Sequence, residues 1–334
     1  MNAPDIDIPA VSVVITTRNR VGKLKRAVRS VQNQTCDTFD IHIVDDASED
    51  ETPAYGNEMA DEHEYIHYWR QEERGGLSAA RNLGLRRSNG EFVAYLDDDD
   101  EWKEEALGRR MAVLDDLTPG EREKLGVIYC GSEVHLVDEN RVTYNMPAIE
   151  GDIAEHVRRA GKLSTIPSSC IFPRRALKDI GGFDEGLESC VDHDIWMQLA
   201  AGGYSARPVH EALSVTYLSR SKDSMVTDTS PRRRGLEQFL RKWEPVFCEW
   251  FGPQEGRRFV AEYRSRVLGG LAVQKLFSGS LGESGRLLRH LIRRNGLLRR
   301  ANLTLPVRVV RHLVRAATPV WALRLYQSLQ KGRI

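Results

Sequence analysis

Acidic residues gather in two short turns, and carboxylates grouped in this way can hold a metal ion or move protons. One turn begins with Asp45 and Asp46, and the other is the run DDDD at residues 97–100. Adjacent carboxylates repel one another unless a cation lies among them. A hard divalent ion with oxygen ligands, Mg²⁺ or Mn²⁺, suits such a group, especially when it also binds a substrate diphosphate. On composition alone, an ordinary solvated acidic loop stays open as an alternative.

Each acidic turn directly follows a short apolar segment that is typical of a buried strand. These segments are residues 40–44 and 92–96, and further strands are predicted at 11–16 and 65–69. Apolar residues at helical spacing lie between them, so the sequence predicts an α/β fold with a mainly parallel sheet and helices on both faces. Ligands of such sheets bind at the carboxyl ends of the strands. We therefore expect the acids of both turns to meet at one edge.

A third acidic position, Asp192, lies at the start of a predicted helix that follows the turn GGFDE at residues 181–185. Asp192 and Trp196 would share one face of this helix, whereas Asp194 points well away from Asp192. Only one of the two aspartates is expected to enter the crevice. An N-cap is the competing role for an aspartate at a helix start.

The segment RGGLSAARNLGL at residues 74–85 contains a glycine pair that allows a tight loop and a close backbone approach to a ligand. Arg74 and Arg81 are candidates for a contact with a diphosphate or a base. For Arg81 an ordinary surface position is an equally open interpretation.

Several classes of protein are disfavoured by what the sequence lacks. No G-x-G-x-x-G follows a strand and no G-x-x-x-x-G-K-[ST] occurs, which argues against a dinucleotide oxidoreductase and a P-loop nucleotidase. The five cysteines are scattered without a C-x-x-C pair, which argues against a zinc site and fits a reducing compartment. No signal peptide is visible, and no apolar run approaches the ~18 residues of a membrane span. A cytoplasmic protein, soluble or peripheral, is expected.

Charge is distributed unevenly along a chain whose formal net charge is zero. Residues 231–334 contain 22 Lys+Arg and 6 Asp+Glu, whereas residues 1–230 contain 26 and 42. The change in composition predicts a catalytic domain over residues 1–230 and a basic, mainly helical region over 231–334, with a possible anionic partner for the second.

The motifs also occur in a recognisable order. They are VSVVITTRNR (11–20), VDDASED (44–50), RGGLSAARNLGL (74–85), GEFVAYLDDDDEW (90–102), and GGFDE (181–185) followed by VDHDIWMQLA (191–200). This order resembles the family 2 glycosyltransferases with the GT-A fold, over roughly residues 9–220. The resemblance implies inverting, divalent-metal-dependent transfer of one sugar from a nucleotide-sugar donor, most commonly a UDP-sugar. The implied acceptor is a hydroxyl of a glycan or lipid-linked molecule in cell-envelope polysaccharide or glycolipid synthesis.

The resemblance further implies roles for single acidic residues. Asp97 and Asp99 form the D-x-D pair that binds Mn²⁺ or Mg²⁺ and the donor, with Asp99 the direct ligand, and Asp98 faces the nucleotide. Asp192 matches the general base, although Val191 stands where the family usually has Glu. The chain lacks the Q-x-x-R-W element of processive synthases, so one sugar per encounter is expected.

The remaining donor contacts implied by the resemblance are Thr16 beside the donor base, Asp46 at the nucleobase or ribose, and Arg74 near the same pocket. Where the family often has Y-R-x-H, this chain has YLSR at residues 217–220, so the phosphate contact is expected to pass to Arg220.

Two other functions stay open. A nucleotidylyltransferase would also use acids and a divalent ion, but it usually needs a Gly-rich basic loop after the first strand, where this chain has TRNRVG at residues 17–22. An inactive carbohydrate-binding protein on the same fold is the other.

The basic region alternates Arg with Leu and Val at helical spacing over residues 286–294 and 307–317. Arg-rich faces beside apolar ones are typical of helices that lie in a membrane interface. The sequence thus predicts peripheral attachment to the cytoplasmic face of an anionic membrane, with packing on the acidic catalytic domain as the alternative. No motif supports nucleic-acid binding.

Overall fold

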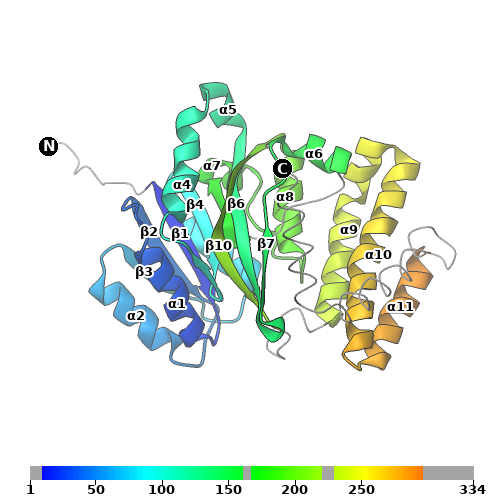
Figure 1. Ribbon diagram of the computed structural model, residues 1–334, viewed down its shortest axis with the longest axis horizontal. Coiled ribbons are helices and arrows are strands. Elements are labelled where there is room, and N and C mark those ends of the chain that lie inside the picture. Colours follow the sequence, from blue (N-terminus) through cyan, green and yellow to red (C-terminus); the bar gives the residue numbers. More distant parts are fainter. Residues whose placement is uncertain (1–9, 161–166, 220–228, 296–334) are drawn as a thin grey trace. The chain divides into compact units, whose positions relative to one another are not determined.

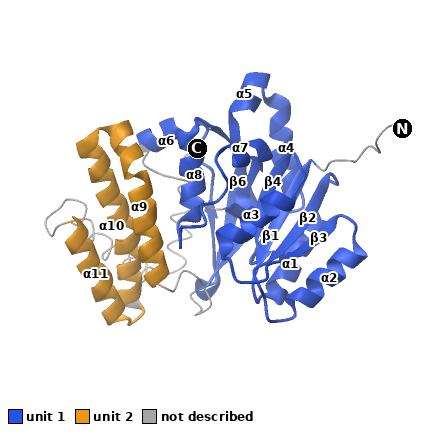
Figure 2. Ribbon diagram, turned by 180° about the vertical axis from the view of Figure 1, so that it is seen from behind, with its two compact units in different colours: residues 1–228 blue, residues 229–334 orange. Residues whose placement is uncertain are grey.

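The computed structural model describes residues 10–160, 167–219 and 229–295 (Figure 1). The chain divides into two compact units, Met1–Asp228 and Thr229–Ile334, which Figure 2 shows in different colours. The strands are β1 (Val11–Thr17), β2 (Phe39–Asp45), β3 (Ile66–Arg70), β4 (Phe92–Asp97), β5 (Asp100–Trp102), β6 (Leu125–Leu136), β7 (Arg141–Asn145), β8 (Gly151–Asp152), β9 (Cys170–Pro173) and β10 (Ser205–Leu218). The helices are α1 (Val21–Gln32), α2 (Thr52–Glu62), α3 (Leu77–Arg87), α4 (Ala106–Met111), α5 (Pro119–Lys124), α6 (Ile153–Ala160), α7 (Arg174–Asp179), α8 (Val191–Ala201), α9 (Thr229–Phe251), α10 (Pro253–Phe277) and α11 (Leu281–Asn295), with 3-10 turns at Ala112–Asp116, Val137–Glu139 and Pro167–Ser169.

The first unit is built on one mixed sheet. Its strand order is β3-β2-β1-β4-β9-β6-β10-β5, with β7 paired to β6 and β8 paired to β10. Strands β3, β2, β1 and β4 are parallel neighbours, and so are β6 and β10. Strand β9 is antiparallel to both β4 and β6, and β5 is antiparallel to β10. The predicted α/β class with a mainly parallel sheet is confirmed, and the antiparallel strands are an addition that the sequence did not predict.

Alternation of side chains along β1 explains why helices cover both faces of the sheet. Val13 and Ile15 are fully buried in a cluster that includes Leu24 of α1. The intervening Val14 faces α3 instead, where a Cβ added at Gly84 would lie 2.3 Å from the Val14 side chain. Because period-two alternation sends neighbouring residues to opposite faces, an apolar β-branched strand needs a helix on each side. Glycine at position 84 lets the second helix approach closely.

The second unit contains helices α9, α10 and α11, which share a polar network. Glu237 accepts hydrogen bonds from Arg264 Nε at 2.9 Å and pairs with His290 Nε2 at 2.8 Å, while Arg264 Nη1 donates to Asn295 Oδ1 at 2.9 Å. Burial raises the pKa of Glu237, but these hydrogen bonds outweigh it and lower the pKa below its usual value. Within the described ranges, none of the helices is both long enough and apolar enough to cross a bilayer.

Candidate functional site

The carboxyl ends of three parallel strands bring the two acidic turns to one edge of the sheet. Thr16 of β1 is level with Val44 of β2 and with Asp97 of β4. One residue further along β1, the carbonyl of Thr17 accepts the backbone N–H of Asp46 at 3.0 Å. Thr16 itself is 8% exposed. The expectation that the acids of both turns meet at this edge agrees with the register.

The acid run at residues 97–100 alternates between partly exposed and buried side chains. The side chains of Asp97 and Asp99 are 32% and 34% exposed. Asp98 and Asp100, measured over the whole residue, are 4% and 6% exposed. Asp98 and Asp99 form the turn between β4, which ends at Asp97, and β5, which begins at Asp100. The two accessible carboxylates are the predicted D-x-D pair, and carboxylate oxygens are the ligands that Mg²⁺ and Mn²⁺ prefer. These residues therefore fit a divalent cation.

Asp98 faces inward, toward a hydroxyl and a guanidinium. Thr17 Oγ1 donates to Asp98 Oδ2 at 2.8 Å, and Arg20 Nη1 lies 3.2 Å from Oδ1. Burial raises the pKa of Asp98 to about 6, although Arg20 opposes this effect. Arg20 Nη1 and Lys23 Nζ each lie 3.3 Å from Asp99 Oδ2. Two cations next to the start of α1 thus balance part of the negative charge.

Asp46 holds the glycine loop in place. Its Oδ1 accepts the N–H of Gly75 at 2.7 Å and the N–H of Gly76 at 3.1 Å. Gly76 has a φ of +85°, a conformation that favours glycine because it has no Cβ. Arg74, the residue before this pair, has an exposed side chain. The structure therefore gives Asp46 a positioning role for the loop, which the sequence did not suggest.

Arg81 of α3 lies between two site carboxylates. Its Nη1 donates to Asp192 Oδ1 at 2.8 Å, and its Nη2 donates to Asp97 Oδ1, also at 2.8 Å. The side chain is 1% exposed, so the surface interpretation of Arg81 is wrong. Burial lowers the pKa of Arg81, but the charges of Asp97 and Asp192 outweigh this and raise the pKa above its usual value. Arg81 thus joins two acids that lie 16 and 111 residues away from it in the sequence.

Asn82, the next residue on α3, clamps the turn that precedes α8. Its Nδ2 donates to the carbonyl of Phe183 and to Glu185 Oε1, both at 2.8 Å, and its Oδ1 accepts the N–H of Phe183 at 2.9 Å. Gly182, with a φ of +74°, lies against the same amide, since a Cβ there would be 2.6 Å from Asn82 Oδ1. The turn GGFDE is therefore fixed to the helix that carries Arg81.

The two aspartates at the start of α8 have different surroundings. The side chain of Asp192 is 33% exposed and pairs with Arg81, whereas Asp194 is 1% exposed and accepts a hydrogen bond from Gln198 Nε2 at 2.9 Å. Asp192 thus stays accessible and Asp194 is buried in the helix packing, in line with the expectation that the two aspartates point in different directions. Burial raises the pKa of Asp192 and the charge of Asp97 adds to this, while Arg81 opposes both.

One neighbour of the acid run was not singled out by the sequence, and one predicted position lies outside the described residues. Ser168 accepts the backbone N–H of Asp97 on its Oγ at 3.1 Å. It therefore supports the end of β4. Arg220, predicted to contact the donor phosphate, lies outside the described residues.

A second cluster of ligand types, on β2 and β3, contains Asp40, His42 and His67. Trp69 Nε1 donates to His42 Nδ1 at 3.0 Å, which leaves the proton of the neutral ring on Nε2, where it is donated to Asp40 Oδ2 at 3.0 Å. A metal ion would need the same Nε2 lone pair. The cluster is thus a hydrogen-bonded chain and not a second metal centre.

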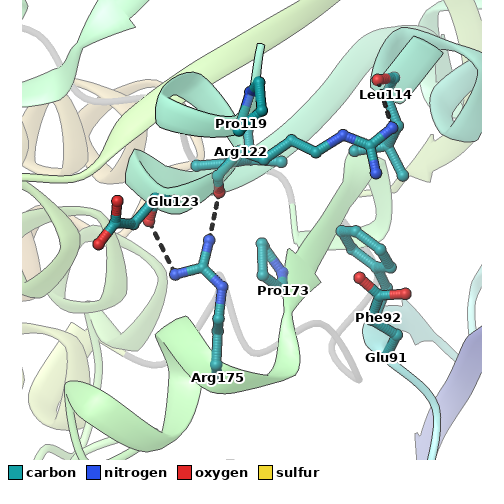
Figure 3. Close-up of a pocket in the computed structure, with 9 residues that line it drawn as sticks. Glu91, Phe92, Leu114, Pro119, Arg122, Glu123, Pro173 and Arg175 are labelled. Carbon is teal, nitrogen blue, oxygen red and sulfur yellow. Dashed lines mark hydrogen bonds between the residues drawn. The ribbon is translucent and has the colours of Figure 1, made fainter. Parts of the chain in front are cut away.

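A cavity of about 520 Å³ lies at the opposite edge of the sheet (Figure 3). Phe92 and Leu125, which line it, are the first residues of β4 and β6. Arg175 points to the end of α5, where it donates to the carbonyls of Arg122 and Glu123 (Figure 3). Its guanidinium is used to cap the helix, and the acidic turns do not line this cavity.

Known proteins are similar to this chain in sequence over part of its length. The chain is 25% identical over 232 residues to an uncharacterized glycosyltransferase of Haemophilus influenzae, covering 68% of this chain and 74% of that protein. It is 36% identical over 105 residues to a GalNAc(5)-diNAcBac-PP-undecaprenol beta-1,3-glucosyltransferase of Campylobacter jejuni, covering 31% of this chain and 34% of the relative.

Solved structures are similar in fold. The S. aureus TarS 1-349 structure in complex with UDP-GlcNAc superposes with a TM-score of 0.62 at 19% identity, covering 85% of this chain and 81% of that one. The mannosyltransferase PcManGT from Pyrobaculum calidifontis, in complex with GDP-Man and Mn²⁺, gives a TM-score of 0.53 at 18% identity, covering 91% and 87%. The model of glycosyl transferase family 2 matches residues 12–181, just over half of the chain. With its GT-A-like sheet and its acids at the carboxyl edge, the chain belongs to glycosyl transferase family 2 and is a glycosyltransferase.

Proposed function

We propose that this enzyme transfers one sugar, with inversion, from a nucleotide-sugar donor to a hydroxyl of a glycan or lipid-linked acceptor, and that it needs Mn²⁺ or Mg²⁺. A UDP-sugar is the proposed donor. The observation that carries the proposal is the pairing of Asp97 and Asp192 with a single guanidinium, each at 2.8 Å. A group suited to the metal and donor and a group suited to proton transfer are thereby held within one small volume.

The chemistry follows from what these carboxylates can do. A divalent ion held by Asp97 and Asp99 would neutralise the charge that develops on the leaving diphosphate. As the oxygen of the acceptor hydroxyl forms a bond to the anomeric carbon, Asp192 accepts the proton of that hydroxyl. The bond from that carbon to the phosphate oxygen breaks, and the nucleoside diphosphate leaves with the electron pair. One displacement with attack opposite the leaving group inverts the anomeric centre.

Asp192 is suited to act as a base because of its surroundings. General bases work best when their pKa lies near the working pH, and an ordinary carboxylate is too acidic for this. Burial and the charge of Asp97 raise the pKa of Asp192, while Arg81 opposes them. The side chain nevertheless keeps 33% of its surface exposed, so an acceptor hydroxyl can reach it.

Known proteins support the choice of donor, metal and acceptor. The S. aureus neighbour was solved with UDP-GlcNAc and the Pyrobaculum neighbour with GDP-Man and Mn²⁺. The Campylobacter relative is named for an undecaprenol-linked acceptor. By analogy we place the reaction in cell-envelope polysaccharide or glycolipid synthesis.

A panel of nucleotide-sugars tests the proposal. Release of nucleoside diphosphate is measured with Mn²⁺, with Mg²⁺ and with EDTA, and donor binding is measured by calorimetric titration. Asp99→Asn is expected to abolish metal-dependent donor binding, because the accessible Asp99 is the proposed direct ligand. Asp116→Asn, at an exposed acid outside the site, is the matched control. Unchanged donor affinity in Asp99→Asn would remove the metal assignment.

The same assays, extended to nucleoside triphosphates with sugar phosphates and to pyrophosphate release, separate the two alternative functions. A nucleotidylyltransferase would release pyrophosphate from a nucleoside triphosphate and a sugar phosphate. An inactive carbohydrate-binding protein would bind without any turnover. Either result would replace glycosyl transfer as the activity of this site.

We further propose peripheral attachment to the cytoplasmic face of the membrane, where a lipid-linked acceptor would be found. Support comes from α11, which exposes Arg286, Arg289 and Arg293 on one stripe. Its Leu287 and Leu291 are buried, so the proposed attachment through this helix is electrostatic. Each basic residue near an anionic leaflet contributes about 1 kcal/mol. The residues at 307–317 that the sequence also assigns to this surface lie outside the described part of the chain.

Co-sedimentation with vesicles containing anionic lipid tests this attachment. The full chain is expected in the pellet at low salt, and the pair Arg289→Gln and Arg293→Gln is expected to weaken binding at least about tenfold. The control removes the same charge from exposed positions of the first unit, with Arg86→Gln and Arg109→Gln. Equal loss in the two pairs would point to net charge, and the idea fails if the full chain stays in the supernatant.

A further inference from the structure

Within the described part of the chain, Arg81 is the residue whose side chain joins both proposed functional acids. Its guanidinium is buried, with 1% of its side chain exposed, whereas the carboxylates of Asp97 and Asp192 are each about one third exposed. Each acid therefore presents one side to the arginine and another side to solvent. The two aromatic rings of Tyr95 and Phe183 lie 5.9 and 5.1 Å from its guanidinium carbon.

Stability alone does not account for this arrangement. Taking a guanidinium and two carboxylates out of water is costly, and apolar replacements of buried ion pairs are often neutral or stabilising. Among the described residues, the ion-pair partners of the Arg81 guanidinium, Asp97 and Asp192, both belong to the candidate site. The arrangement is better explained by what it does for those two acids.

We infer that Arg81 is a positioning residue that sets the distance and orientation between the donor-binding turn and the catalytic base. This inference rests on the proposed function, in which Asp97 binds the metal and donor and Asp192 is the base. A guanidinium is planar, and its N–H groups point in fixed directions, so one arginine fixes two carboxylates relative to each other. The anomeric carbon and the attacking hydroxyl must meet between these two acids, where small misplacements cost much rate.

The chain fixes Arg81 itself on both sides. Residue 82 is clamped to the turn before α8 through three hydrogen bonds, so helix α3 and the start of α8 move together. On the side of the donor-binding turn, Ser168 Oγ accepts the backbone N–H of Asp97 at 3.1 Å and holds the end of β4 in place. The bridge is therefore anchored at the helix that carries the arginine and at the strand that carries Asp97.

A double-mutant cycle tests the inference. Arg81→Lys keeps the charge, but one ammonium cannot donate along both directions of the fork. Turnover is expected to fall about 10²-fold in Arg81→Lys. In the Asp192→Asn background the same change is expected to lower turnover by less than about threefold, because a residue that acts through Asp192 has little left to position. Arg87→Lys, on the same helix with its guanidinium 4.5 Å from the ring of Trp69, is the control.

The outcomes are distinct. Equal losses in both backgrounds would overturn the positioning role while leaving the base assignment intact. Unchanged turnover in Asp192→Asn alone would overturn the base and the inference with it. If Arg81→Lys unfolds, Arg81→Gln is measured with added guanidinium ion, which must restore turnover when Asp192 is present and fail to do so in the Asp192→Asn background. Restoration in both backgrounds, or in neither, refutes the inference.

Discussion

Removal of the Asn82 side chain gives a sharp test of how the site is assembled. In Asn82→Ala the buried N–H and C=O of Phe183 lose their partners, as does Glu185. A buried main-chain group without a partner costs about 1–3 kcal/mol, so the two groups of Phe183 together cost about 2–6 kcal/mol. This is a large part of a typical folding free energy of about 5–15 kcal/mol.

Scanning calorimetry of the full chain measures this loss. For a unit of this size, about 1 kcal/mol shifts the melting temperature by about 2–4 °C, so a fall of roughly 4–24 °C is expected. Asn57→Ala, which removes one exposed hydrogen bond to the carbonyl of Pro53 at 2.8 Å, is the control. Turnover should fall more than donor affinity, because the turn leads to Asp192. A melting shift no larger than that of the control would refute the clamp.

Three further predictions concern the acids. Asp192→Asn is expected to lower turnover by about 10²–10⁴-fold with nearly unchanged donor affinity. Asp194→Asn, at a buried position, should lower the melting temperature and leave turnover unchanged. The reverse pattern in steady-state kinetics would reassign the base. Burial, and after it the charge of Asp97, raise the pKa of Asp100 from 3.8 to about 8. Between these two pH values the folded chain holds a proton on Asp100 that the unfolded chain has lost. With the metal removed by EDTA, the free energy of unfolding should therefore rise as pH falls from 8 to 6. Urea titrations check this, and Asp100→Asn should remove that contribution. Lys23→Met is expected to tighten Mn²⁺ binding in calorimetric titrations, because Lys23 Nζ lies 3.3 Å from the proposed ligand Asp99 and competes with the ion; an unchanged Kd contradicts this.

The amino-terminal half of the sheet could be predicted from the sequence because its signals are local. The segments predicted at 11–16, 40–44 and 92–96 lie within strands β1, β2 and β4, and the segment predicted at 65–69 overlaps β3, so that every strand end differs by at most one residue. Each is a short apolar run bounded by polar residues, so burial on both faces can be recognised without knowing the neighbours. The meeting of the acidic turns followed from the parallel order.

The rest depended on contacts between distant segments. Strand β9 is only four residues long and pairs antiparallel to β4 and β6, which its sequence CIFP does not reveal. The burial of Arg81 was missed for a related reason, since arginine is seldom buried and its partner Asp192 lies 111 residues away. The signal that could have found it is the apolar company of Arg81, with Ala79 and Ala80 before it.

The separation between Arg81 and Asp192 also bears on the order of events as the chain leaves the ribosome. Both acidic turns and the arginine are synthesised early, but the second carboxylate follows 111 residues after the arginine, and closing so long a loop carries an entropic cost. Until then a guanidinium that belongs in the interior has only Asp97 to balance it. The Arg81 link can therefore form only after α8 has been synthesised, and β10, which pairs with β6 and β5, is made later still. A shorter nascent chain contains the acidic turns and Arg81, but it does not yet hold the proposed base beside the proposed donor turn.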